Sequence, residues 1–100
     1  MVHIQIITRD RANIHALLRQ AIQDRRIRSF ETVRVKGGLK IQHKNPGTPG
    51  SISLSRKPGL LLATLRCNAK NKEWKLLEAF VGRMTYHFRA DIAAMNIQFE

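Results

Sequence analysis

The chain has 100 residues, of which 18 are Lys or Arg and 7 are Asp or Glu, so its net charge is +11, and 43% of its residues are hydrophobic. This length and composition indicate one globular domain over residues 1–100, and exclude a multidomain enzyme and a wholly disordered chain. The single cysteine, Cys67, excludes an intrachain disulfide framework and a cysteine-rich zinc site.

The apolar segments are short. The first of them, Met1–Ile7, is too short for the apolar core of a secretory signal, and charged residues begin at Arg9. The longest unbroken apolar run, Leu60–Ala63, is far below the roughly 20 residues of a membrane span. We therefore expect a cytoplasmic protein with no membrane partner.

The first third of the chain predicts a strand and then a helix. Val2, Ile4 and Ile6 alternate with polar residues, which is typical of a strand. Thr8 and Asp10 are the expected N-caps of the following helix, which we expect to end near residue 25. Its apolar stripe has helical spacing and consists of Ile14, Leu17, Leu18, Ala21 and Ile22.

The middle of the chain predicts four strands. Residues 32–36 and 39–42 alternate on either side of a Gly-Gly pair, which is typical of a tight hairpin. Residues 51–55 alternate strictly, and a Pro-Gly pair favours a type II turn before an apolar strand over 60–67. A loop rich in proline and glycine covers 45–50, and we expect it to be a hairpin end.

The last third predicts a helix over about 71–89 and a closing strand over 95–99. The expected order is therefore β-α-β-β-β-β-α-β, an α+β domain. The simplest arrangement is a ferredoxin-like two-layer sandwich, with two helices on a mixed or antiparallel sheet of five to six strands. The apolar arc of the second helix contains Trp74, Leu76, Leu77, Phe80, Val81, Met84 and Phe88.

The charge is concentrated in the first two-thirds, with +4 over residues 1–30, +6 over 31–69 and +1 over 70–100. In the middle strands we expect Val33, Val35, Leu39, Ile41, Ile52 and Leu54 to face the core. The opposite parity carries cations and hydroxyls and no carboxylate. Its cations are Arg34, Lys36, Lys40 and Lys44, and Arg56 and Lys57 extend the patch at the second turn.

Such a basic face suits phosphate, which Lys and Arg neutralise and hydroxyls hydrogen-bond. The alternative is a solvated outer face that keeps the protein soluble. The face carries no aromatic residue, so we expect phosphate contacts without base stacking. Along the first helix, one flank presents Arg11, His15, Arg19 and Arg26, which form either a second phosphate-contacting ridge or an ordinary exposed side.

Catalysis has one candidate. His43, together with Lys40 or Lys44 and a distant histidine, has the residue types of a metal-independent ribonuclease. No two histidines have the spacing of a metal site, and the carboxylates are scattered, so we expect no metal and no cofactor. The sequence favours a non-enzymatic protein.

The leading hypothesis is a small basic domain that binds RNA or duplex DNA, or another polyanion, mainly through phosphate. The candidate binding residues are Arg34, Lys36, Lys40, Lys44, Arg56, Lys57, Arg11 and Arg19. The alternative is a protein-interaction or assembly module that homodimerises through the apolar strand around Leu60–Leu62. A ribonuclease that uses His43 is the third hypothesis.

Overall fold

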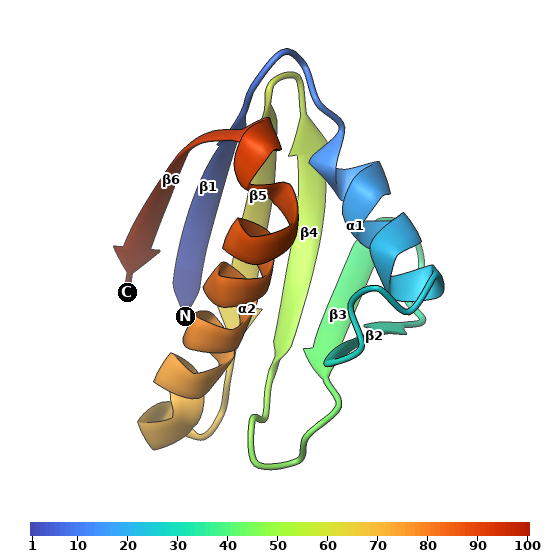
Figure 1. The fold of residues 1–100 in the computed structure, drawn as a ribbon. Helices are drawn as coiled ribbons and strands as arrows, with labels where there is room; N and C mark the ends of the chain where they lie inside the picture. The colour runs from blue at the N-terminus through green and yellow to red at the C-terminus, as the bar shows by residue number, and fades with distance from the viewer.

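The chain folds into one sheet with two helices on one of its faces (Figure 1). The computed structural model describes all 100 residues. The order of helices and strands expected from the sequence is confirmed. In chain order the elements are β1 (Val2–Thr8), α1 (Ile14–Gln23), β2 (Phe30–Val33), β3 (Leu39–His43), β4 (Ser51–Lys57), β5 (Leu60–Arg66), η1 (Lys70–Lys72), α2 (Glu73–Phe88), η2 (Arg89–Asp91) and β6 (Ile92–Phe99).

The six strands are antiparallel throughout and lie in the order β2-β3-β4-β5-β1-β6. The α+β class, with an antiparallel sheet and two helices, is confirmed. The ferredoxin-like arrangement is not confirmed, because β3 and β4 lie between β2 and β5. As a result α1 joins β1 to a strand four positions away in the sheet.

The start of α1 differs from the expectation. Asn13, not Thr8 or Asp10, caps the helix, because its Oδ1 accepts a hydrogen bond at 3.1 Å from the backbone N–H three residues on. The backbone has φ 50° at Asp10 and 58° at Arg11, a left-handed turn that prevents an earlier start. Arg25, with φ 60°, ends the helical path at its other end, close to the expected place.

In the hairpin of β2 and β3, the side chains of β2 face the opposite way from the prediction. Val33 lies opposite Lys40, and directly opposite residues share a face, so Val33 points away from the helices. Val35 lies beyond the end of β2 and is exposed. The expectation that both valines enter the core was therefore wrong. The strand begins two residues earlier than expected, and Phe30 fills the core position instead.

The apolar strand β5 is interior, because it is hydrogen-bonded to β4 on one side and to β1 on the other. Leu61 is buried beneath the helices, whereas Leu60 and Leu62 are half-buried on the opposite face. Gly59 has φ 69°, as the expected Pro-Gly turn requires. Since both edges of β5 are paired, this strand offers no edge for strand pairing between two copies.

Helix α2 presents Leu76, Phe80, Met84 and Phe88 to the sheet, a row with a spacing of four residues. Trp74, expected in the core, is 58% exposed. Two residues before Leu76 correspond to about 200° around the helix, which turns the indole away from the contact row. No helix of the structure is both long and apolar enough to cross a membrane.

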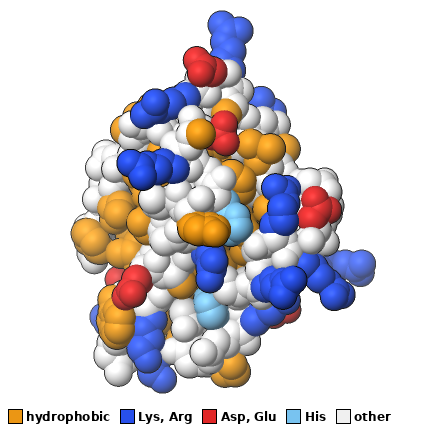
Figure 2. Space-filling model, in the orientation of Figure 1, with side chains coloured by type: hydrophobic (Ala, Val, Ile, Leu, Met, Phe, Trp, Pro, Cys, Tyr) orange, Lys and Arg blue, Asp and Glu red, His pale blue; other side chains and the backbone are white.

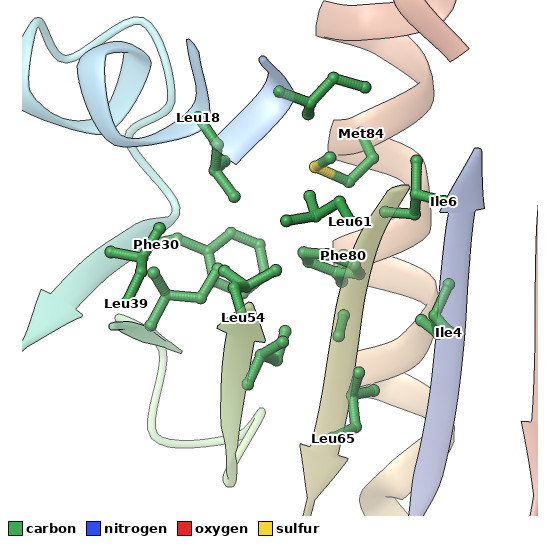
Figure 3. Packing of buried hydrophobic residues seen from close by; sticks show 14 of the residues in the cluster. Ile4, Ile6, Leu18, Phe30, Leu39, Leu54, Leu61, Leu65, Phe80 and Met84 are labelled. Atoms are coloured by element: carbon green, nitrogen blue, oxygen red, sulfur yellow. The ribbon is translucent and has the colours of Figure 1, made fainter. Parts of the chain in front are cut away.

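The core consists of 19 buried residues, all apolar. At its centre the rings of Phe30 and Phe80 meet edge to face, with centroids 6.4 Å apart, an arrangement favourable for aromatic pairs. Figure 3 shows this pair between Leu18 of α1 and the isoleucines Ile4 and Ile6 of β1. The core therefore joins both helices to the middle and one end of the sheet.

The loop before β4 ends at Gly50, which lies against two other elements. Its φ is 114°, and an added Cβ would lie 2.6 Å from the carbonyl oxygen of Arg66 and 2.9 Å from Cδ2 of Leu76. The loop is thus held between β5 and α2 at this point. A glycine is required both by the backbone conformation and by the lack of space.

Gly50→Ala should lower the free energy of unfolding by more than about 1 kcal/mol, since the new methyl group meets backbone and the positive φ strains it. Gly82→Ala is the matched control, because Gly82 lies in α2 with no atom within 4 Å of the added Cβ. This control should raise the free energy of unfolding by about 0.5–1 kcal/mol. Urea unfolding measures the change in both variants, and equal changes in the free energy of unfolding would contradict the close packing at Gly50.

Candidate nucleic-acid interface

A cavity of about 690 Å³ lies where α1 begins and the β4–β5 hairpin turns. Three of the predicted cations line it. Arg56 and Lys57 end β4, and Arg11 lies in the turn before α1. Thr8 also lines the cavity, and its Oγ1 is buried without a hydrogen-bond partner. Two segments far apart in the chain thus direct positive charge to one place.

His15, in the first turn of α1, lines the same cavity. Burial lowers the pKa of its imidazole, and the positive charges of Arg19 and Arg56 lower that pKa further. The imidazole therefore lies near cations of both α1 and β4.

Arg19 extends the same flank one helical turn beyond His15. Its Nη2 donates a hydrogen bond to the carbonyl oxygen of Gly38, at 3.2 Å, in the β2–β3 hairpin. A second cavity, of about 320 Å³, lies there and is lined by Arg19 and Arg34. We call the whole set the α1 strip. It comprises Arg11, His15, Arg19, Arg34, Arg56 and Lys57.

No carboxylate lines either cavity of the α1 strip. The sequence flank included Arg26, but this residue lies beyond the helix, 3.7 Å from the carboxylate of Asp24. Figure 2 shows that blue Lys and Arg side chains are spread over the helical face and outnumber the red Asp and Glu there. The strip is therefore distinguished by cations around cavities that no carboxylate lines, although Asp10 lies beside Arg11 in the turn before α1, and not by being the one place that carries charge.

The open face, meaning the sheet face that the helices leave uncovered, is less basic than expected. One row across it runs from Lys40 through Ser53, Thr64 and His3 to Gln98, with a single lysine. The expected absence of carboxylates was wrong, because the two sides of β2 are exchanged relative to the expectation, which places Glu31 with Val33 on this face. Glu31 lies opposite Gln42, whose Nε2 donates to the glutamate Oε1 at 2.9 Å.

The remaining candidates of the sheet are dispersed. Arg34 and Lys36 lie in the loop between β2 and β3, and Lys44 follows the end of β3, where its backbone N–H bonds to the carbonyl of Ser29. Lys40 alone among these four lies within a strand. The structure thus brings Arg11, Arg19, Arg34, Arg56 and Lys57 together along α1 and leaves Lys36, Lys40 and Lys44 outside this group.

His43 lies on the helix-covered face, opposite Phe30, so it does not share a face with Lys40. Its Nδ1 accepts a hydrogen bond from the backbone N–H of Asn45 at 3.0 Å. Burial and the nearby Arg83 lower its pKa. The group of His43 with Lys40 suggested by the sequence is not assembled.

His87 of α2 is a histidine to which the sequence assigned no specific role. Burial lowers its pKa, as do the charges of Arg83 and Arg26, and its Nε2 is buried without a hydrogen-bond partner. It shares the influence of Arg83 with His43. The one sequence signal for this position was its place at the margin of the apolar arc of α2. No group of three His, Cys, Asp or Glu side chains is arranged to hold a metal ion.

Comparisons of the chain with protein-family models, with curated proteins and with solved structures found no match in any of the three.

Three histidines with lowered pKa make stability depend on pH. Because the pKa values of His15, His43 and His87 are lowered in the fold, the unfolded chain binds more protons at these residues than the folded chain as the pH falls through 6.5, the ordinary histidine pKa. The free energy of unfolding should therefore fall as the pH drops below about 6.5. Thermal unfolding between pH 7.5 and 5.5 measures this trend, which should weaken in the triple variant with glutamine at these positions. A constant or rising stability would contradict it.

Proposed function

We propose that this protein is a cytoplasmic domain that binds nucleic acid through phosphate contacts of the α1 strip. The supporting observation is that five Lys or Arg residues and one histidine lie along α1, around two cavities that no carboxylate lines. Phosphate contacts from Lys and Arg supply most of the salt-dependent affinity in nucleic-acid complexes. The proposal assigns binding and no reaction.

The extent of the strip favours a polymer of phosphates over a single one. The strip begins before α1, at Arg11, and continues past Arg19 to the β2–β3 hairpin. Asn13, which lines the first cavity, and Arg19, which lines the second, are already separated by about 9 Å along the helix axis. Neither cavity is lined by Phe, Tyr or Trp, so the expected contacts are to the backbone of duplex DNA or structured RNA, without base stacking on these side chains.

The ferredoxin-like plan also stays a proposal. Two helices on one face of an antiparallel sheet support it, with β3 and β4 as additions between β2 and β5. This plan carries no claim about function, because such sheets serve many activities.

Removing three charges from the strip should weaken binding far more than removing three elsewhere. The strip variant replaces Arg11, Arg56 and Lys57 by glutamine, and the matched control does so at Lys70, Lys72 and Lys75. The control residues lie in η1 and the first turn of α2 and line neither cavity. Fluorescence anisotropy with a labelled DNA duplex and a hairpin RNA, over a salt series, gives the affinity and its salt slope.

For the duplex, a plot of log affinity against log salt has a negative slope. In the strip variant this slope should become less steep by about 2–3, because each lost phosphate contact removes about 0.9. Lys40→Gln should have little effect, because Lys40 lines neither cavity. Equal losses in the two triple variants would assign binding to overall charge. No binding at low salt would overturn the proposal, and recovery of one acidic protein from nuclease-treated lysate would favour the assembly alternative.

Binding should also strengthen as the pH falls from 7.5 to 6. A phosphate beside His15 favours its protonated form and offsets the lowering of its pKa by burial, Arg19 and Arg56. The same titration with His15→Gln should show a smaller gain in affinity. An identical gain in both proteins would place the responsible proton elsewhere.

A further inference from the structure

The two edge strands of the sheet differ in how well they are protected against pairing with a strand of another molecule. The edge strand β2 has four residues, carries Glu31, and is followed by Arg34 and Lys36. The other edge strand, β6, has eight residues and contains no charged residue and no proline. Short length, charge and proline are the usual means of preventing strand pairing between molecules. The β6 edge lacks all three.

Apolar side chains continue the core up to the β6 edge. Met95 and Ile97 lie opposite Ile6 and Ile4 on the helix-covered face, yet they are only half-buried. Phe99 lies on the same face and is 68% exposed. Figure 1 shows β6 at the left margin of the sheet, outside the cover of α2, and Figure 2 shows orange hydrophobic side chains along that margin. The core is therefore left open on this side.

We propose that two copies of this chain dimerise by antiparallel pairing of their β6 strands, which forms one continuous sheet of twelve strands. A second copy is the favoured occupant because β6 is complementary to itself. In a two-fold antiparallel pair directly opposite residues share a face. With Asn96 opposite the same residue of the second copy, Met95 faces Ile97, Ala93 faces Phe99 and Ala94 faces Gln98.

This register places no charge against a like charge, and it sets the large exposed ring of Phe99 against a small alanine. Met95 and Ile97 complete their burial against each other across the two-fold axis. The pairing also satisfies the backbone groups of β6 that point away from β1. Apolar burial and ladder hydrogen bonds thus act at the same edge.

The charge distribution favours the same edge. Each copy carries +11, but residues 92–99 are uncharged. α1 packs against β2 and β4, in the half of the sheet that is remote from β6. The two β4 strands of the dimer are seven strand spacings apart, about 34 Å. This separation is several times the Debye length of about 8 Å at physiological salt, so repulsion between the two α1 strips is screened.

Sedimentation equilibrium of the nucleic-acid-free chain tests the proposal. Between 10 and about 200 μM the chain should show twice its own mass, and the dimer should persist at 0.5 M salt. Asn96→Lys sets two lysines against each other at the two-fold axis and should give a monomer. Asn96 is exposed and donates only to Gln5 on the open face, so the fold should remain, as circular dichroism would show.

Ser53→Lys is the matched control, because it adds the same charge to an exposed position on the open face, in interior strand β4. It should remain a dimer.

A second measurement uses Asn96→Cys in a Cys67→Ser background, which should form a disulfide-linked dimer under mild oxidation. Ser53→Cys in the same background should not. A monomeric chain at all concentrations, or a dimer unaffected by Asn96→Lys, would overturn the proposal. Loss of nucleic-acid binding would leave it standing.

Discussion

The pairing of β1 with both β5 and β6 is the contact on which the rest of the structure depends. Val2, Ile4 and Ile6 lie between two strands from the second half of the chain, and all three side chains are buried. This pairing brings the first strand beside the last and fixes which face receives the helices. Because β5 returns to β1, the strands β2, β3 and β4 form a meander that ends at one edge, and β6 is the other edge.

The position of the basic residues follows from this arrangement. With α1 above the β2–β4 half of the sheet, its polar flank meets the end of β4 and the β2–β3 hairpin, and the cations of the three segments lie around shared cavities. The C-terminal third, with a charge of +1, contributes α2 and β6 on the other half. A charge asymmetry along the chain thus becomes an asymmetry across the sheet.

The sequence predicted the elements well and the faces less well. Alternation and helical spacing depend on local burial, so the order of elements, the central position of β5 and the closing strand were all accessible. The face of β2 was not, because its pairing with β3 decides which side chains point inward, and an offset of one residue exchanges the two faces. Val33 and Val35 have high strand propensity, and Phe30 preceded the predicted start.

The candidate site divides in the same way. The flank of Arg11, His15 and Arg19 is visible as a spacing of four residues, but its meeting with Arg56 and Lys57 depends on pairing between distant strands. The expected basic sheet face failed for the complementary reason, since the exchange of the two sides of β2 brought Glu31 onto it. Non-local register is the quantity that single-sequence reasoning does not contain, and it decides both results.

The two proposed surfaces lie on opposite halves of the sheet, and this separation bears on how they interact. Polyanion binding at the α1 strip would neutralise part of the +11 charge and so reduce the work of bringing two copies together. At physiological salt, charges about 34 Å apart are screened across several Debye lengths, so this coupling is small. At 0.01 M salt the Debye length is about 30 Å, comparable with the separation, and the coupling becomes appreciable. The two proposals therefore predict that binding and assembly are independent of each other except where counterions are scarce.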